Sequence, residues 1–181
     1  SEDIIMNLSR EIEIFSLLKH PAVLRFVGYC PKNFKNKPKP VIISEFAANK
    51  SLDKILESER NGCGNNNWDD TKKLINIYGI ASGMLYMHRN NIIHRDLKPG
   101  NIFLDENLYP KIADFGLSKK LSDFDENDKN VDIIQSGFKG TYGYCSPEII
   151  TKQEYTKSGD VYAFAMIVYE ILTLENLYEK G

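Results

Sequence analysis

The chain has 181 residues, 42% of them hydrophobic, and a formal net charge of −2, which suits one domain with a sizeable core and excludes global disorder. This charge gives no electrostatic case for nucleic acid or an anionic membrane as the main partner. Three widely separated cysteines without a Cys-x-x-Cys pair support neither a disulfide framework nor a zinc site. We therefore expect a reducing, cytoplasmic location, and no apolar run reaches the ~18–20 residues of a membrane span.

The first part of the chain predicts one helix and then an antiparallel hairpin. Apolar residues at helical spacing between positions 8 and 19 predict an amphipathic helix, which Pro21 ends. Two runs typical of strands follow at 23–29 and 41–46. Between them, residues 31–40 are rich in Lys, Asn and Pro, and no core would bury them.

Two more helices are predicted before the middle of the chain. Ser51 is a typical N-cap for a helix that runs to about Ser58. A low-complexity loop follows at 61–67, and Asp69 or Asp70 then caps a long helix whose apolar residues keep helical spacing.

The second half begins with two short predicted strands at 102–104 and 111–113. No periodicity is visible from 114 to 148, and the acidic residues at 122–132 are most simply a solvated loop face. Residues 158–173 are apolar almost all round, which predicts a helix buried on every side.

Two short polar segments suit phosphoryl chemistry. A carboxylate, a lysine and a carboxamide fall within six positions of the run HRDLKPGN at 94–101, and the triplet DFG begins at Asp114. Phosphoryl transfer needs a carboxylate that orients a hydroxyl and oxygen ligands that hold Mg²⁺ across the phosphates. Asp96 suits the first task, and Asn101 with Asp114 suits the second. Either segment alone is a weak signal, but both together in this order are a strong one.

These segments resemble the catalytic loop and the metal-binding triplet of the protein-kinase family. The resemblance covers the whole chain and implies an α+β, two-lobed fold: 1–46 would be a remnant of the N-lobe, 47–50 the hinge and 51–181 a partial, mostly helical C-lobe. The N-lobe part would hold the helix called αC and the hairpin, and the C-lobe part would end after the buried central helix. Because no glycine-rich loop or Val-Ala-x-Lys strand precedes Glu11, we expect a fragment of a longer kinase that is inactive in isolation.

The resemblance also implies roles for single residues. Asp96 would be the catalytic base, and Lys98 would neutralise the transferring phosphoryl group. Asn101 and Asp114 would hold Mg²⁺ on ATP. The remaining nucleotide contacts implied are Ser44 as gatekeeper, the Glu45 carbonyl and the Ala47 backbone at adenine, and Phe103 beneath the adenine ring.

Regulatory roles are implied at four positions, Glu11, Arg95, Ser136 and Thr141, with Tyr142 as a further candidate for phosphorylation. Glu11 resembles the αC glutamate, although a solvated helix residue is the alternative. Ser136, or otherwise Thr141 or Tyr142, would be phosphorylated, and Arg95 would pair with the phosphate on Ser136. Thr141 would also hydrogen-bond the catalytic loop.

Two structural features are implied as well. One is a stacked column formed by Phe15, Phe26, His94 and Phe115. The other is an anchor for the catalytic-loop backbone at Asp160.

The implied function is transfer of a phosphoryl group from MgATP to Ser or Thr of a protein in signalling. Lys98 and Thr141 match serine/threonine kinases, whereas the hairpin and hinge resemble tyrosine kinases, a mixture that resembles the tyrosine-kinase-like group. The alternatives are a catalytically inactive, pseudokinase-like binding module and an inactive fragment. Chains without catalysis typically lack Asp96, Asn101 or Asp114, and all three are present here.

Overall fold

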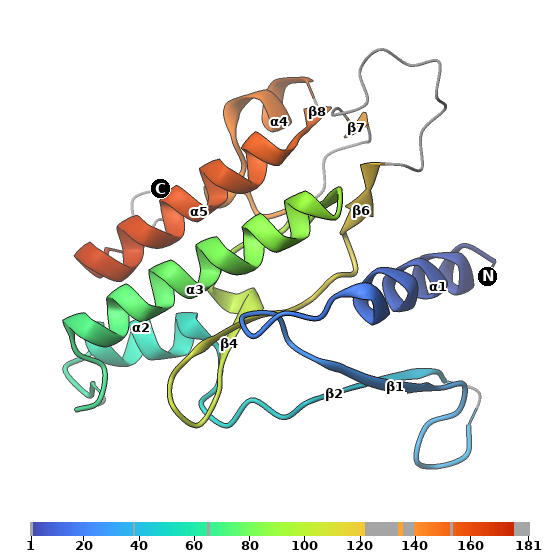
Figure 1. Cartoon of the computed structure of the whole chain (residues 1–181), viewed down its shortest axis with the longest axis horizontal. Helices are drawn as coiled ribbons and strands as arrows, with labels where there is room; N and C mark the ends of the chain where they lie inside the picture. The colour runs from blue at the N-terminus through green and yellow to red at the C-terminus, as the bar shows by residue number, and fades with distance from the viewer. Residues whose placement is uncertain are drawn as a thin grey trace.

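The computed structural model describes residues 2–37, 39–64, 66–121, 134–135, 140–152 and 154–175. Its helices are α1 Glu2–Leu17, α2 Leu52–Arg60, α3 Asp70–Arg89, α4 Pro147–Lys152 and α5 Lys157–Thr173, with short 3₁₀ turns η1 Pro99–Asn101 and η3 Tyr142–Tyr144. Its strands are β1 Phe26–Cys30, β2 Val41–Ser44, β3 Ile92–Ile93, β4 Ile102–Leu104, β5 Pro110–Ile112, β6 Lys119–Lys120, β7 Ile134–Gln135 and β8 Glu154–Tyr155. Figure 1 shows a small part, made of α1 and the β1–β2 hairpin, beside a larger helical part, which confirms the α+β organisation.

The small part is an antiparallel hairpin on which α1 packs. The register runs from Phe26 opposite Ser44 to Cys30 opposite Val41, with an irregularity between Phe26 and Gly28. The first predicted strand therefore begins later than expected. Its first residues join the larger part instead, because Leu24 N–H donates to the carbonyl of Ile112 at 2.8 Å.

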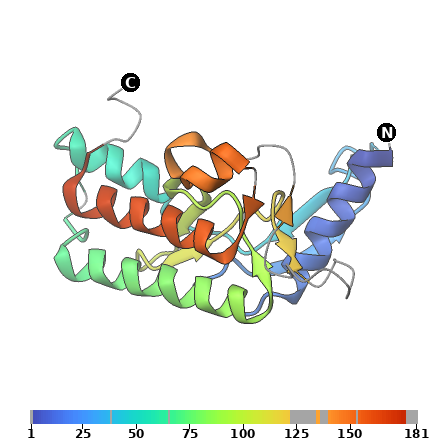
Figure 2. The ribbon, with the colours of Figure 1, turned by 90° about the horizontal axis from the view of Figure 1, so that it is seen from above.

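The larger part is built on α2, α3 and α5, which Figure 2 shows lying side by side. Asp69, not Asp70, is the N-cap of α3, because its side chain accepts the N–H of Lys72 at 2.7 Å. The main core combines buried side chains of these helices with those of β4 and β5; they include Leu52, Leu56, Ile80, Met84, Met87, Ile102, Leu104, Ile112, Ile167 and Ile171.

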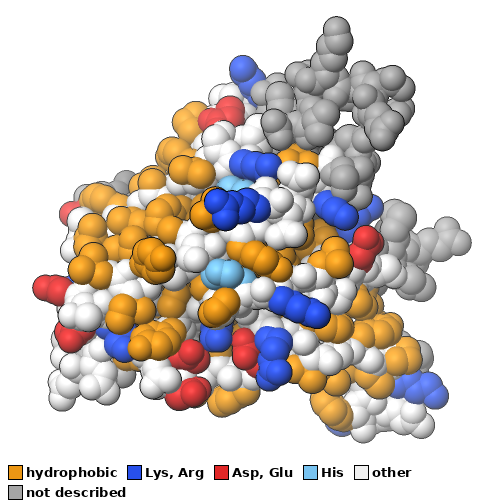
Figure 3. Space-filling view, in the orientation of Figure 1, with side chains coloured by type: hydrophobic (Ala, Val, Ile, Leu, Met, Phe, Trp, Pro, Cys, Tyr) orange, Lys and Arg blue, Asp and Glu red, His pale blue; other side chains and the backbone are white. Residues whose placement is uncertain are grey.

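The prediction that the last helix is buried on every side is wrong for the described chain. Ala163, Ile167 and Ile171 are buried, but Val161 is 53% exposed and Leu172 60%. The described neighbours of α5 are mainly α3 and η3, and these cover one face only. Figure 3 shows apolar side chains exposed on the side of the molecule where these helices lie.

None of the described helices is long and apolar enough to cross a membrane. Residues 49–50 pair with β4, since Asn49 N–H donates to Leu104 O and Leu104 N–H to Lys50 O, both at 2.9 Å. The predicted division of the chain at 46/47 and 50/51 stays a prediction.

Candidate active site

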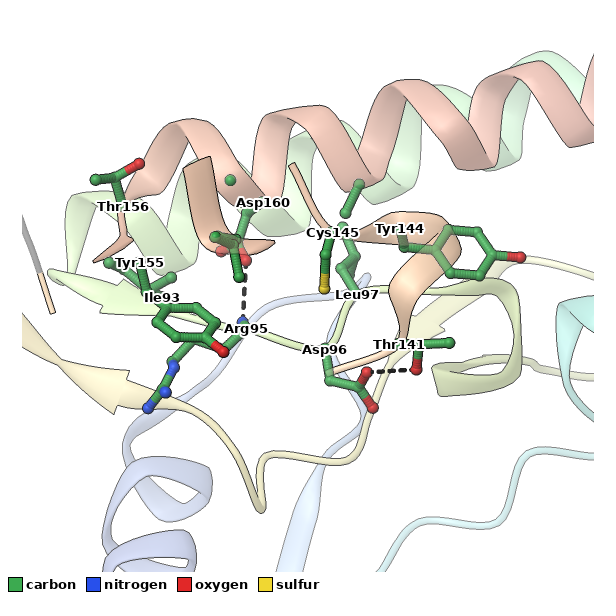
Figure 4. A pocket seen from close by; sticks show the side chains of 13 residues that line it. Ile93, Arg95, Asp96, Leu97, Thr141, Tyr144, Cys145, Tyr155, Thr156 and Asp160 are labelled. Carbon is green, nitrogen blue, oxygen red and sulfur yellow. Dashed lines mark hydrogen bonds between the residues drawn. The ribbon is translucent and has the colours of Figure 1, made fainter. Parts of the chain in front are cut away.

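The polar run at residues 94–101 is a loop between β3 and β4, and a side chain of α5 anchors it. The buried Asp160 carboxylate accepts the backbone N–H groups of His94 at 2.8 Å and Arg95 at 3.0 Å, and it contacts His88 Nε2 at 2.9 Å. Figure 4 shows this contact between Asp160 and the Arg95 backbone. Arg95 has φ 72°, a conformation that is costly for a non-glycine residue, so the Asp160 contacts hold the chain in a strained turn.

Four polar side chains meet at the open end of this loop. Thr141 Oγ1 donates to Asp96 Oδ1 at 2.8 Å, and Lys98 Nζ lies 2.9 Å from both Thr141 Oγ1 and Asp96 Oδ2. Asn101 Nδ2 donates to Asp96 Oδ2 at 2.9 Å and to the Asp96 carbonyl at 2.8 Å. We call Asp96, Lys98, Asn101 and Thr141 the catalytic network. Residues far apart in the sequence thus hold the Asp96 carboxylate in one orientation.

Asn101 is oriented so that its amide oxygen can serve as a ligand. Both hydrogens of Nδ2 are engaged by Asp96, and among the described residues no donor is bonded to Oδ1. Asp114 is exposed, with φ 63°, and the N–H of Gly116 approaches its Oδ1 at 3.4 Å. An amide oxygen and a carboxylate are the hard oxygen ligands that Mg²⁺ prefers, so by the chemistry of their side chains Asn101 and Asp114 would be the residues that hold a magnesium ion.

Glu11 brings a second carboxylate to this region from α1. It lies beside Gly116, and burial, followed by the negative charge of Asp114, raises the pKa of the Glu11 carboxyl. In the described part of the chain Glu11 forms no ion pair. A cation near these two carboxylates would therefore be electrostatically favoured.

The predicted column of aromatic rings is present. Ring centroids are 5.4 Å apart for Phe15 and Phe26, 5.0 Å for Phe15 and Phe115, and 5.6 Å for His94 and Phe115. His94 is fully buried, and its ring accepts from Asp96 N–H at Nδ1 and faces the Ala113 carbonyl at 3.0 Å through Nε2. This pattern requires the tautomer that carries its proton on Nε2. The column links α1 to the catalytic loop by packing.

The predicted nucleotide-contacting residues take no part in the described hydrogen bonds of the catalytic network. Ser44 at the end of β2 is exposed, while Ala47 and Phe103 are half-buried. The Glu45 N–H donates to the Arg25 carbonyl at 2.9 Å. These positions stay predictions.

Sequence reasoning missed what the Glu45 side chain does. Its carboxylate accepts the N–H of Arg25 at 2.9 Å and lies 3.7 Å from Lys111 Nζ. The Glu45 side chain therefore connects the segment after β2, where it lies, with the residue before β1 and with β5. The only sequence signal for this contact is an acidic residue near the end of a run typical of a strand.

Arg95 lies in a positively charged corner. Its guanidinium stacks over the Tyr155 ring at 4.0 Å, and the small cavity that Arg95 lines has two further cations, Arg10 and Lys119, and one carboxylate, Glu11. Burial, and to a lesser degree the charge of Arg10, lower the pKa of Arg95. Arg10 was not foreseen, because nothing in the local pattern of α1 sets it apart. Ser136, the predicted phosphorylation site, lies outside the described residues.

A groove of about 640 Å³ adjoins the catalytic network on the side of α2. Glu170 of α5 lines it and is almost fully buried; Tyr144 donates a short hydrogen bond to Glu170, and Arg60 lies 3.3 Å from its other oxygen. Burial raises the pKa of Glu170, and the contacts with Tyr144 and Arg60 oppose that rise without cancelling it.

This raised pKa predicts a pH-dependent contribution of Glu170 to stability. The native carboxyl keeps its proton above the ordinary value of 4.5, so its contribution is fully present below that pH and is lost as pH rises through the raised pKa. The difference in free energy of unfolding between wild type and Glu170→Gln should therefore fall as pH rises through the range above about 4.5. Urea denaturation of the full-length protein across this range measures it.

Glu57 provides a matched control with the opposite sign. It lines the same groove, and its hydrogen bond from Lys54 at 2.8 Å lowers the pKa of the Glu57 carboxyl. Any effect of Glu57→Gln should therefore grow as pH rises toward 4.5. Parallel pH profiles for the two variants would contradict the assignment of a raised pKa to Glu170.

Comparison with known proteins shows the family of this chain. The family model described as the protein kinase domain matches residues 1–181, so the chain belongs to the protein kinase domain family. The predicted kinase-like fold is thereby confirmed.

Its relatives are plant receptor-like kinases. The chain is 37% identical over 171 residues to cysteine-rich receptor-like protein kinase 25 of Arabidopsis thaliana, a match that covers 92% of this chain and 23% of that protein. It is 38% identical over 176 residues to cysteine-rich receptor-like protein kinase 1 of the same plant, covering 94% and 26%. It is 37% identical over 173 residues to cysteine-rich receptor-like protein kinase 10 of Oryza sativa subsp. japonica, covering 93% and 25%.

Such kinases belong to the tyrosine-kinase-like type of serine/threonine kinases, which confirms the predicted group. The chain spans about a quarter of the length of the curated relatives it matches.

Proposed function

We propose that the protein carrying this chain transfers the γ-phosphoryl group of MgATP to Ser or Thr residues of other proteins in cytoplasmic signalling. The observation that carries this proposal is the catalytic network, in which a carboxylate, an ammonium, a carboxamide and a hydroxyl are bonded to one another at 2.8–2.9 Å. Such a constellation holds a base and a cation in place before substrate arrives, and phosphoryl transfer depends mainly on this kind of positioning.

Each residue of the network has a task in that reaction. Asp96 accepts the hydrogen of the acceptor hydroxyl and aligns its oxygen with the phosphorus atom. Lys98 places its positive charge where the transferring group gathers negative charge. Asn101 and Asp114 would hold Mg²⁺, which when bound neutralises the charge of the phosphates.

Serine/threonine specificity is supported by the contact between Lys98 and Thr141. Both residues bind the same carboxylate, Asp96. This is the pairing of lysine and threonine that the resemblance to serine/threonine kinases implies.

The remaining predicted roles belong to the same proposal. Ser44, the Glu45 carbonyl, Ala47 and Phe103 would contact the adenine of ATP. Arg95 would bind an activating phosphate in its positively charged corner, where burial and the neighbouring Arg10 favour an anion. The cytoplasmic location is supported by Cys30, Cys63 and Cys145, which are all free thiols.

The alternative is a pseudokinase that binds ATP or partners without catalysis. A pseudokinase is expected to lack the catalytic carboxylate or to hold it in an orientation that cannot support catalysis. Asp96 is instead oriented by Asn101, Lys98 and Thr141, and this observation favours the enzyme.

We expect the full-length protein to transfer radiolabelled phosphate from ATP to a generic protein substrate, in a reaction that stops when EDTA removes Mg²⁺. Phosphoamino-acid analysis should show phosphoserine and phosphothreonine. Phosphotyrosine alone would contradict the proposed specificity, and ATP binding without transfer would favour the pseudokinase. Residues 1–181 alone should transfer no measurable phosphate.

A further inference from the structure

The loop between β1 and β2 concentrates positive charge in a chain whose net charge is −2. Residues 31–40, which we call the lysine loop, contain four lysines and no acidic residue; the lysines are Lys32, Lys35, Lys37 and Lys39. All four are exposed, and in the described part of the chain none of them forms an ion pair. Because their charges are not compensated locally, the loop is a patch of positive charge that the small net charge of the whole chain conceals.

The tip of the loop is an ordered turn, closed by Asn33. The Asn33 side-chain oxygen accepts the N–H groups of Lys35 and Lys37, both at 3.0 Å. The backbone N–H of Asn33 donates to the Lys37 carbonyl at 3.0 Å, and Asn36 has φ 57°, a conformation that asparagine tolerates well. The lysines are therefore presented by a small hydrogen-bonded turn.

Phe34 lies at the tip of this turn and is 96% exposed. A phenylalanine gains nothing from such exposure in water, because its ring keeps almost all of its apolar surface hydrated. Figure 1 shows the loop projecting from the end of the hairpin, away from α2, α3 and α5. The tip is thus convex, positively charged and aromatic.

These features fit a flat anionic surface better than a groove or a duplex. All the cations are lysines, whose ammonium groups act as compact point charges on flexible stems, whereas arginine is the residue suited to fork-like recognition of single phosphates. An aromatic ring among lysines is the combination that places a segment at the boundary of lipid headgroups and acyl chains.

We propose that the lysine loop docks the protein on an anionic membrane surface, with Phe34 entering the headgroup boundary and the four lysines lying over anionic headgroups. This contact would orient the kinase domain at the membrane. It does not depend on phosphoryl transfer.

A tryptophan at the tip tests the proposal. In the full-length Phe34→Trp variant, vesicles that contain phosphatidylserine should shift the added indole emission to the blue, and brominated lipid should quench it. Trp68 is only 4% exposed, so the wild type provides the background signal from this chain. Vesicles of phosphatidylcholine alone should cause no shift.

Lysine substitutions in the same Phe34→Trp background test the charges. Each lysine near an anionic surface contributes about five-fold to the partition coefficient, so Lys35→Gln with Lys37→Gln should weaken it by roughly 25-fold. Lys19→Gln with Lys152→Gln removes the same charge from exposed sites outside the loop and should change the partition by less than about two-fold.

Three outcomes would overturn the proposal. One is an equal shift with neutral vesicles, and another is equal weakening by the two double variants. The third is the same shift with single-stranded RNA or polyglutamate at equal ionic strength, since the loop would then bind polyanions in general. Because the emission reports on position 34 itself, attachment of another segment to the membrane would not imitate the expected result.

Discussion

Replacing Asp96 with Asn in the full-length protein should lower kcat by roughly 10²–10⁴-fold and leave ATP affinity nearly unchanged. The amide keeps the shape of the carboxylate but loses its negative charge and its ability to accept a proton. Asn101 and Thr141 both donate to Asp96, and one of them would face the new amide nitrogen. The loss should therefore appear in the chemical step, because the residues proposed to contact adenine form none of the described hydrogen bonds to Asp96.

Asp69→Asn is the matched control for this experiment. Asp69 undergoes the same chemical change at the start of α3, and asparagine caps helices as well as aspartate does. Its kcat should equal that of the wild type. Single-turnover kinetics and equilibrium ATP titration on both variants separate the chemistry from binding. Full kcat in Asp96→Asn would contradict the proposed role of Asp96, whereas equal losses in both variants would indicate a folding defect.

The catalytic loop could be predicted because the residues that its chemistry requires lie close together in the sequence. Phosphoryl transfer needs a base, a cation and an oxygen ligand at short spacing, and the run at 94–101 has all three. The association with Thr141 and the anchoring by Asp160 followed from the family resemblance. Neither pairing is visible from local spacing, since both partners lie far along the chain.

The parts that could not be predicted depend on tertiary neighbours. Composition shows that α5 is apolar, but it does not show how many elements pack around the helix, so the exposed face at Val161 and Leu172 was unforeseen. The direction of the Glu45 carboxylate depends on how the hairpin meets β5. The choice of Asp69 over Asp70 as the helix cap needed the side-chain geometry.

The lysine loop illustrates a different limit of sequence reasoning. Its composition was plain, but the net charge of the whole chain pointed away from an anionic partner. The exposure of Phe34 at the tip and the ordered turn at Asn33 became visible only in three dimensions. The net charge of a whole chain thus does not reveal a local excess of positive charge, which can bind an anionic partner.

Replacing Asp160 with Ala should cost about 3–5 kcal/mol of unfolding free energy and abolish measurable phosphoryl transfer. The carboxylate is the shared acceptor for the buried N–H groups of His94 and Arg95, and each orphaned donor costs about 1–3 kcal/mol. Arg95 would also lose the contact that holds its strained φ of 72°. Since Asp96 is the next residue, its carboxylate would move with the relaxing turn.

Asp160→Asn and Val161→Ala sharpen this test. The side-chain amide in Asp160→Asn retains one good acceptor oxygen, so this variant should lose roughly half as much stability as Asp160→Ala. Val161→Ala, on the exposed face of the same helix, should change stability by less than about 0.5 kcal/mol. Urea denaturation of the three variants and amide exchange at Arg95 measure these effects. If Asp160→Ala unfolded at the same urea concentration as Val161→Ala, Asp160 would not be the anchor of the catalytic loop.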